Sequence, residues 1–433
     1  MTATRKVCAS PSPDETGPPG VLDAATKVPH FRGSTATFHG LEAGPSLSLT
    51  DAGREAGRGA VPGRSGGATY MADRMRVAII GVGGMGIANY HAQAFLATGK
   101  AEIAGICDIQ PEALTTFGER FGVPPDLRHG DHRQMLSEVR PDVVVVCTNE
   151  VLHARLTVDA ASYGPRAILC EKPMAMSLAE ADAMLEACAH NGVVLVVGHQ
   201  RRYMPQYARA KELLQYGAIG ALEHIQAMGH PGSSLMVDGT HTVDLIRFYV
   251  GDARAEWVLG QVDARTLRTG WGHVLEDAAL ALIKFDGGVR AWLAVGGSGA
   301  TPAREGLSRL SGQNYHRILL HGTRGRIEIA GDGVAEGEPQ LRVIRGDRTE
   351  VVDVAACAGA GGWHGGLSPQ ADLLQALEDG HAHPLDARSA RATLEILMAV
   401  FESARLGRLI PLPLENRANP LEQMLAERRD RGQ

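Results

Sequence analysis

The sequence has few aromatic residues, no long apolar run and no clustered positive charge. Phe, Trp and Tyr make up 5% of its 433 residues, and so few rings argue against a stacking platform for single-stranded nucleic acid. The formal net charge is −6, without a stripe of Lys and Arg, which makes nucleic acid and anionic membranes poor partners. No apolar stretch is long enough to span a bilayer. We therefore expect an ordinary soluble protein.

Cysteine is also scarce, with six residues and no C-x-x-C spacing. Cys107, Cys147 and Cys170 each stand at the end of an expected core strand, where a thiol packs as a small hydrophobic group. We expect neither a disulfide framework nor a metal site, and a cytoplasmic location fits this pattern.

Residues 1–70 differ in composition from the rest of the chain. They are rich in Pro, Gly, Ser, Thr and Ala and show no period of 2 or 3.6. A segment of this kind buries too little apolar surface to offset the entropy lost on ordering. We expect a disordered extension or an overextended gene start, in either case without a role in the function.

Strand and helix signals alternate between residues 74 and 200. Continuous apolar runs of this kind are typical of parallel strands that are covered on both faces. The pattern predicts an α/β protein whose N-terminal domain, residues 74–200, is a doubly wound parallel sheet. The expected strands are 76–81, 101–107, 142–147, 166–170 and 193–197, and the expected helices are 84–98, 111–121, 131–139, 151–163 and 177–190.

The pattern changes after Gly198. Runs of alternating character are joined by turns such as Phe285-Asp286-Gly287-Gly288, which indicate hairpins. Residues 201–412 are expected to form an α+β domain with a large, mostly antiparallel open sheet, whose last helices pack back on the first domain. Residues 413–433 are expected to be a charged tail. The expected strands are 221–228, 255–266, 277–285, 288–295, 316–322, 325–330 and 340–354, and the expected helices are 204–217, 239–250, 366–379 and 387–406.

The first apolar strand runs directly into Gly81-x-Gly83-x-x-Gly86. Gly81 allows a tight turn, Gly83 lets the backbone approach a pyrophosphate, and Gly86 lets the next helix sit close to the sheet. Free N–H groups at the start of that helix attract phosphate oxygens. Because a strand precedes the motif and a helix follows it, a dinucleotide-binding loop is favoured over a glycine-rich turn without a ligand.

Asp108 selects among dinucleotides. It ends the second apolar run, 22 positions beyond Gly86. A carboxylate at this point accepts hydrogen bonds from ribose hydroxyls and repels a 2′-phosphate. The three residues that follow, Ile109-Gln110-Pro111, offer no cation for such a phosphate. The predicted cofactor is therefore NAD, with NADP disfavoured.

Glu171-Lys172-Pro173 follows the fourth apolar strand-like run of the domain, 166–170. Ligands of open α/β sheets bind at the carboxyl ends of the strands. Lys172 can donate to a substrate oxygen and stabilise its negative charge as hydride leaves, and Glu171 can orient the lysine or the cofactor. A solvated Glu-Lys pair before a loop explains the same residues equally well.

A second polar cluster, Asp238, His241 and Asp244, precedes an apolar helix. His241 and Asp244 are three residues apart on one helical face, so Asp244 could fix the tautomer of a histidine that takes a hydroxyl proton. A metal site of His230, Asp238 and His241 is a weaker alternative, because the spacing is not distinctive. The remaining interpretation is a helix cap at Asp238 beside a surface histidine.

Two further segments carry polar residues near the expected junction of the domains. Arg201-Arg202-Tyr203 could bind a polar ligand or form an interdomain salt bridge. In the segment Cys147-Thr148-Asn149-Glu150, followed by His153, the histidine could lie near a nicotinamide ribose or simply start a helix.

Taken in this order, the segments resemble the Gfo/Idh/MocA family, which includes glucose–fructose oxidoreductase and inositol dehydrogenase. The resemblance spans about residues 74–412. It implies a Rossmann domain and a substrate domain, with Lys172 as the catalytic lysine and His241 as the proton-handling histidine. Many members carry Asp four residues before that histidine, whereas this chain has Val237 there and Asp238 one position later.

The resemblance and the motifs predict an NAD-dependent oxidoreductase that transfers hydride between nicotinamide and a hydroxyl carbon of a sugar, polyol or sugar derivative. The family also implies a homodimer or homotetramer joined through the C-terminal sheet. The expected catalytic residues are Lys172, His241, Asp244 and Asp238, and the expected cofactor-binding residues are Gly81, Gly83, Gly84, Met85, Gly86, Asp108, Thr148, Asn149, His153, Glu171, Lys172 and Arg202.

Two other functions stay open at this stage. One is a glycoside hydrolase that uses NAD transiently and would cleave an aryl glycoside without net formation of NADH. The other is an NAD-binding protein that has lost its chemistry, for which the displaced Asp238 is the only support. The sequence names no particular substrate.

Overall fold

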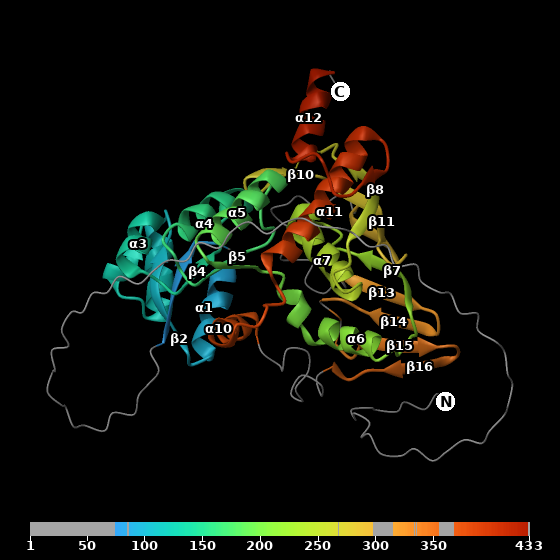
Figure 1. Cartoon of the computed structure of the whole chain (residues 1–433), viewed down its shortest axis with the longest axis horizontal. Helices are drawn as coiled ribbons and strands as arrows, with labels where there is room; N and C mark the ends of the chain where they lie inside the picture. Colours follow the sequence, from blue (N-terminus) through green and yellow to red (C-terminus); the bar gives the residue numbers. More distant parts are fainter. Residues whose placement is uncertain are drawn as a thin grey trace, which may run out of the picture. The chain divides into compact units, whose positions relative to one another are not determined.

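The computed structural model describes residues 74–84, 86–266, 268–297, 315–332, 334, 336–354 and 368–431 (Figure 1). The expected extension, residues 1–70, lies outside the described residues, and so does Met85 of the predicted phosphate-binding loop. Among the helices of the described ranges, none is both long and apolar enough to pass through a membrane.

Within these ranges, six parallel strands form a sheet in the order β3-β2-β1-β4-β5-β6. This order is that of a doubly wound dinucleotide-binding sheet, which confirms the predicted Rossmann architecture. All four residues of β4 are buried, and burial on both faces explains the unbroken apolar runs. The strands are β1 (Met75–Ile80), β2 (Ala101–Cys107), β3 (Arg128–His129), β4 (Val143–Val146), β5 (Ala167–Cys170) and β6 (Val194–Val197).

The helices between these strands begin and end at residues with clear capping roles. The Asp131 side chain accepts a hydrogen bond at the start of α3, and Ser177 does so at the start of α5, as N-caps commonly do. Helix α1 begins only at Ile87, because Gly86 before it has a left-handed backbone. The helices are α1 (Ile87–Ala97), α2 (Pro111–Phe121), α3 (His132–Val139), α4 (His153–Ala161) and α5 (Leu178–His190).

A second sheet has nine strands in the described part of the chain, in the order β16-β15-β14-β13-β7-β12-β11-β8-β17. Only β7 and β12 pair in parallel, which confirms the predicted mostly antiparallel sheet. The expected strand 340–354 is instead a hairpin, because Gly346 and Asp347 form a two-residue turn. The strands are β7 (Leu222–Met228), β8 (Ala255–Asp263), β11 (Ala278–Phe285), β12 (Arg290–Gly296), β13 (Arg317–Gly322), β14 (Gly325–Ile329), β15 (Leu341–Arg345), β16 (Arg348–Val351) and β17 (Ile410–Pro411).

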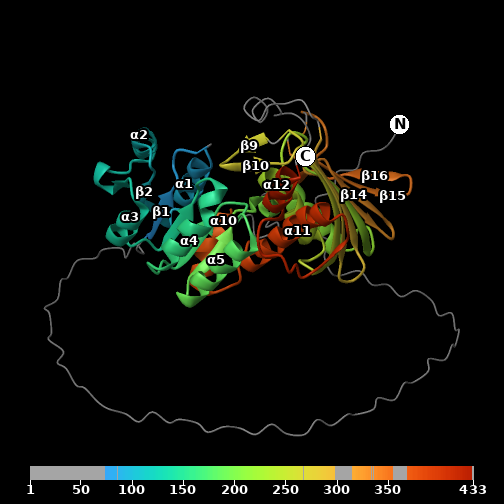
Figure 2. The same cartoon turned by 90° about the horizontal axis from the view of Figure 1, so that it is seen from above.

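The last long helices connect the two sheets. Helix α11 contacts β8 of the larger sheet as well as α5 and β6, and lies between the sheets in both views (Figures 1 and 2). Helix α10 packs on α1, where Gln370 Nε2 donates to His91 Nδ1 at 2.8 Å. The C-terminal helices are α6 (Pro205–Gln215), α7 (Thr240–Tyr249), α10 (Pro369–Asp379), α11 (Ala387–Leu406) and α12 (Pro420–Asp430).

The expected charged tail is wrong for most of its length, because residues 420–430 form α12. Leu421, Met424 and Leu425 are buried, and the helix packs against α11. These three apolar residues follow the i, i+3, i+4 spacing of a helix face. Charged neighbours on the other face concealed this short pattern.

A buried ion pair fixes α7 to the segment after β6. Arg202 donates through Nε and Nη2 to the two carboxylate oxygens of Asp244, each at 2.8 Å. Both side chains are 3% exposed. Two parallel hydrogen bonds between charged groups fix distance and orientation together. Arg202 Nη1 also donates to Asp252 Oδ2 at 2.9 Å.

We predict that Asp244→Asn lowers the free energy of unfolding by about 3–5 kcal/mol, because it leaves the buried guanidinium of Arg202 poorly compensated. The matched control is Arg254→Ala, which breaks an ion pair with Asp286 whose side chains are 64% and 45% exposed. That change should cost at most about 1 kcal/mol. Urea unfolding measures both values, and equal small losses would contradict the prediction.

Candidate active site

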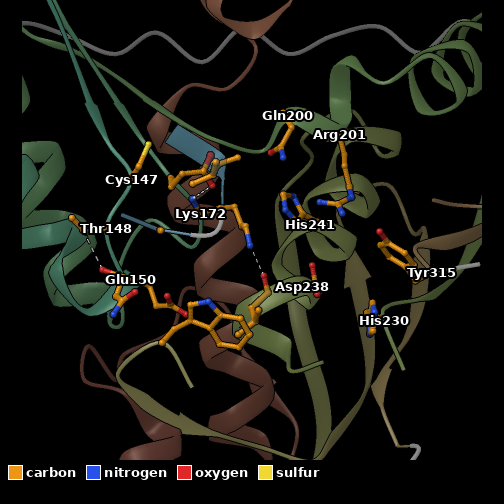
Figure 3. A pocket seen from close by; sticks show the side chains of 16 residues that line it. Cys147, Thr148, Glu150, Lys172, Gln200, Arg201, His230, Asp238, His241 and Tyr315 are labelled. Carbon is orange, nitrogen blue, oxygen red and sulfur yellow. Dashed lines mark hydrogen bonds between the residues drawn. The ribbon is translucent and has the colours of Figure 1, made fainter. Parts of the chain in front are cut away.

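A cavity of ≈ 440 Å³ lies where the loops after β4 and β5 meet the segment before α7 (Figure 3). Its wall comes from both halves of the chain, so neither sheet forms it alone. The first domain contributes Gly84, Ile87, Cys147, Thr148, Asn149, Glu150, Glu171 and Lys172, and the later segments contribute Gln200, Arg201, His230, Val237, Asp238, His241, Trp271 and Tyr315.

Two glycines shape the loop between β1 and α1. Gly81 has a φ of +89°, and a Cβ there would lie 2.9 Å from the backbone nitrogen of Thr148, so no larger residue fits. Gly86 has a φ of +85°, but a Cβ there would meet no atom within 4 Å. Its expected role in close helix–sheet packing is therefore wrong. The position requires glycine for its left-handed backbone.

The start of α1 suits an anionic ligand. Gly86 provides no capping side chain, and the first turn has no acidic residue, so the N–H groups and positive end of the helix dipole stay available. Asp108 Oδ2 accepts a hydrogen bond from Gly83 N at 2.7 Å, which places its carboxylate beside the loop. These residues fit the phosphates and ribose of a dinucleotide.

Lys172 reaches across the cavity to the second domain. Its Nζ donates to the carbonyl oxygen of Val237 at 2.7 Å. Val237 lies in η4 (Leu235–Gly239), a π-helical turn that begins after Ser234, whose side chain accepts from Val237 N. In Figure 3 the side chains of Lys172, Asp238 and His241 face the same cavity.

Asp238 lies inside the π turn and lines the cavity. The expectation that it caps a helix is wrong, because Ser234 caps the turn and Gly239 precedes α7 without a side-chain cap. A π turn holds one residue more than an α-helical turn. This wider turn lets an acid three residues before His241 face the cavity.

His241 is only 2% exposed, so the interpretation as a surface histidine is wrong. Burial, followed by the positive charges of Arg201 and Lys172, holds the pKa of its imidazole well below the ordinary value. The ring is therefore neutral near pH 7. Its Nδ1 is buried and has no hydrogen-bond partner in the described ranges. A neutral imidazole can accept a proton at a ring nitrogen that faces the cavity.

Asp244 does not hold His241, contrary to the expectation from their spacing. Both of its oxygens accept from Arg202, and Asp244 does not line the cavity. The same pair turns Arg202 inward, and the cavity lining does not include it, so its expected contact with the cofactor gains no support. The salt bridge lies within residues 201–412 and is not the interdomain pair of the alternative interpretation. Arg201 lines the cavity instead, and its Nε donates to Asp332 Oδ2 at 2.9 Å.

His153 is 1% exposed and ties two loops of the site together. Its Nδ1 lies 2.8 Å from the Pro173 carbonyl oxygen, and its Nε2 lies 3.0 Å from that of Thr148. Burial lowers the pKa of His153, but Cys170 and the two carbonyls outweigh it and raise the pKa to about 9. The protonated ring donates to both carbonyls. His153 is the first residue of α4, as the alternative interpretation predicted, and it does not line the cavity; its place near a nicotinamide ribose stays a prediction.

A buried chain of hydrogen bonds holds Glu171 behind Lys172. His91 Nε2 donates to Glu171 Oε1 at 2.9 Å, while Gln370 Nε2 donates to His91 Nδ1. Burial raises the pKa of Glu171, but the hydrogen bond from His91 and the charge of Lys172 outweigh burial and bring the pKa below its ordinary value. Glu171 therefore keeps a negative charge beside Lys172.

The sequence analysis missed Glu150, Trp271 and Tyr315, which line the cavity. Only Trp271 carries a local signal, since it stands between two glycines that suggest a tight turn. In the described part of the chain, no group of three or more His, Cys, Asp and Glu side chains is placed to hold a metal ion. The alternative of a metal site that includes His230 therefore gains no support.

The fold and the cavity define a dinucleotide-binding protein with a second domain that completes the site. Residues 75–199 match GFO_IDH_MocA, described as an oxidoreductase family with an NAD-binding Rossmann fold. Residues 226–414 match the C-terminal alpha/beta domain of this oxidoreductase family. The chain belongs to the Gfo/Idh/MocA family of NAD-binding oxidoreductases.

Two similar proteins are dehydrogenases. Myo-inositol 2-dehydrogenase of Thermotoga maritima is 26% identical over 291 residues, which cover 63% of this chain and 80% of that protein. D-apiose dehydrogenase of Paraburkholderia graminis is 28% identical over 366 residues, which cover 79% of this chain and 91% of that protein.

Solved structures share the fold. The structure of levoglucosan dehydrogenase in complex with NADH and levoglucosan has a TM-score of 0.64 and 22% sequence identity, covering 79% of this chain and 100% of that chain. The structure of aldose-aldose oxidoreductase from Caulobacter crescentus, complexed with glycerol, also has a TM-score of 0.64 and 22% sequence identity. The match covers 78% of this chain and 100% of that chain.

We predict that Gly198→Ala destabilises the protein through Glu171. A Cβ at Gly198 would lie 2.6 Å from Glu171 Oε1, so the carboxylate must move away from His91. Losing a hydrogen bond to a charged group should cost about 1.5–3 kcal/mol. Gly130→Ala is the control, because a Cβ there would meet no atom within 4 Å.

The pH dependence of unfolding tests the cause of this loss. The pKa of Glu171 is lowered in the folded state, so its stabilisation is present above the unfolded pKa of about 4.3 and is lost as pH falls through the folded value. The difference in free energy of unfolding between wild type and Gly198→Ala should therefore become smaller at acidic pH. If this difference in free energy of unfolding stays constant with pH, steric strain alone explains the lower stability of Gly198→Ala.

Proposed function

We propose that this protein is an NAD-dependent oxidoreductase that transfers hydride between nicotinamide and a hydroxyl-bearing carbon of a sugar, polyol or sugar derivative. The observation that carries the proposal is the shared cavity of Lys172, from the first domain, and His241, from the second. A cation that stabilises a developing alkoxide and a neutral imidazole that takes its proton are the groups this oxidation requires. The similarity to myo-inositol and D-apiose dehydrogenases supports the substrate class.

NAD, when bound, supplies the hydride-accepting chemistry. Lys172 Nζ donates to the reacting oxygen in place of the Val237 carbonyl and stabilises its charge. His241 takes the hydroxyl proton on a ring nitrogen that faces the cavity. Asp238 accepts a hydrogen bond from a further substrate hydroxyl, while Thr148 and Asn149, which line the same wall, border the cofactor.

We predict that Lys172→Ala lowers kcat by on the order of 10²–10³-fold, the usual loss when one stabilising donor is removed, and leaves NAD affinity nearly intact. NADH absorbance with NAD and a panel of inositols, aldoses and sugar acids measures turnover. Lys100→Ala is the control, since that ammonium group pairs with Glu378 on the surface and its side chain is 55% exposed. Unchanged turnover in Lys172→Ala would remove this residue from the chemistry.

We further propose that NAD is preferred over NADP because of the Asp108 carboxylate beside Gly83. Asp108→Ser removes a charged hydrogen-bond acceptor and its repulsion of a 2′-phosphate. The ratio of kcat/KM for NAD to that for NADP should fall by about tenfold or more. An unchanged ratio would show that another residue selects the dinucleotide.

A redox-neutral glycoside hydrolase is the second candidate. A protein of Akkermansia muciniphila described as glycosyl hydrolase family 109 protein 1 is 29% identical over 180 residues, which cover 38% of this chain and 37% of that protein. Such a reaction regenerates NAD and would use the same cavity. Cleavage of an aryl glycoside without NADH formation, lost in Lys172→Ala, would favour it.

We also propose that the chain forms a homodimer or homotetramer through the outer face of the nine-stranded sheet. Large apolar side chains on four adjacent strands are between 38% and 49% exposed. Contiguous apolar surface of this kind is typical of an interface. The side chains are Met228 on β7, Leu259 on β8, Leu280 and Leu282 on β11, and Trp292 on β12.

A further inference from the structure

A short hairpin outside both large sheets reaches the cavity. Strands β9 (Arg268–Gly270) and β10 (His273–Leu275) pair antiparallel, with Gly270 opposite His273. The turn is therefore the two residues Trp271 and Gly272. Figure 2 shows the hairpin between the six-stranded and nine-stranded sheets, and Trp271 lines the cavity.

The turn is an unfavourable place for tryptophan. Trp271 has a φ of +48° and Gly272 a φ of +89°, and two positive φ angles in a two-residue hairpin turn favour Asn-Gly or Gly-Gly. A bulky residue in the left-handed region is a genuine outlier. Such outliers persist where the surroundings or the function require that side chain. The local backbone cost therefore points to a role for the indole in the cavity.

Both ends of the hairpin are fixed. At its base, Arg268 Nη1 donates to the Gly232 carbonyl oxygen at 3.0 Å. Near its tip, His273 Nε2 lies 2.9 Å from Glu150 Oε1, and both side chains are 7% exposed. Glu150 follows β4 of the first domain, so the hairpin bridges the two domains. The indole therefore forms a fixed wall of the cavity.

Among the described residues that line the cavity, the charges leave no surplus cation. Arg201 donates to Asp332, and Lys172 lies beside the ionised Glu171. Recognition of a phosphate or carboxylate group normally uses unpaired Arg or Lys donors. The hydrogen-bonding side chains that line the same cavity include Asp238 and Gln200, which suit hydroxyl groups.

We propose that Trp271 is a specificity-determining residue that packs its indole against the C–H face of an uncharged cyclic polyol or sugar. The ring hydroxyls then point to the polar side chains of the same cavity. This inference rests on the proposed oxidoreductase function and narrows its substrate class. An aromatic face beside a few placed polar groups is the usual construction of a site for a partly apolar ring.

Trp271→Asn separates this role from folding, because Asn is favoured at this turn position. We expect the melting temperature to be unchanged or higher. KM for a cyclic substrate should rise by about fivefold to tenfold, with a smaller change in kcat, since the indole binds ground state and transition state alike. NADH affinity, measured by fluorescence titration, should be unchanged. Trp271→Phe keeps part of the aromatic face and should give an intermediate KM.

The substrate panel pairs each neutral ring with charged or open counterparts: myo-inositol and glucose against glucuronate, glucose 6-phosphate and sorbitol. Wild type should prefer a neutral ring by at least about tenfold in kcat/KM, a difference of about 1.4 kcal/mol. Isothermal titration of the preferred ring into the enzyme–NADH complex should show the same loss of affinity in Trp271→Asn as the KM does.

Four results would overturn the inference. Preference for a charged or open substrate would refute the substrate class. A KM in Trp271→Asn equal to that of wild type would refute the assignment of Trp271, while the proposed oxidoreductase function stands. Weaker NADH binding with unchanged KM would place the indole on the cofactor. If wild type oxidises no compound of the panel, the proposed function fails and this inference fails with it.

Discussion

The hydrogen bond from Lys172 Nζ to the Val237 carbonyl oxygen joins the two halves of the site. Its donor follows a strand of the Rossmann sheet, and its acceptor lies in the π turn before α7. Neither the donor nor the acceptor is fixed only by the backbone hydrogen bonds of its own strand or turn. His153 fixes the Lys172 loop through the Pro173 carbonyl, and Glu276 Oε1 accepts from Leu235 N at the first residue of the π turn. The distance between the candidate catalytic groups therefore depends on buried polar contacts between segments far apart in sequence.

The sequence predicted the two sheets because burial leaves a direct trace in residue order. Strands such as β4 are covered on both faces and read as four valines in a row, whereas β12 alternates because one face is open. Elements of two residues, β3 and β17, are too short to show a period. Helix α12 was missed for a different reason, since its buried face shows few apolar positions and its ion pair between Glu427 and Arg405 of α11 leaves no periodic pattern in the sequence.

The site was predicted less completely, because its geometry depends on competition between partners. Spacing placed His241 and Asp244 on one helical face. Asp244 instead pairs with Arg202, 42 residues earlier, which gives it two charged hydrogen bonds, where His241 would give one. Local spacing contains no information on such a distant competitor. Trp271 was missed for a related reason, because a turn residue is assigned to a cavity only once the hairpin is placed against Glu150.

Three buried histidines show how surroundings assign different tasks to one side chain. His91 donates at Nε2 and accepts at Nδ1, and His153 faces carbonyl oxygens at both nitrogens. Both nitrogens of each ring are therefore hydrogen-bonded, and each ring positions a neighbouring residue. His241 combines a place on the cavity wall with a buried Nδ1 that has no partner among the described residues. Burial, followed by the charges of Arg201 and Lys172, lowers the pKa of its imidazole and keeps the ring neutral in the resting site. The proposed role of His241 in proton transfer therefore depends on its neutral ring and its place on the cavity wall, whereas hydrogen bonds already occupy both nitrogens of His91 and His153.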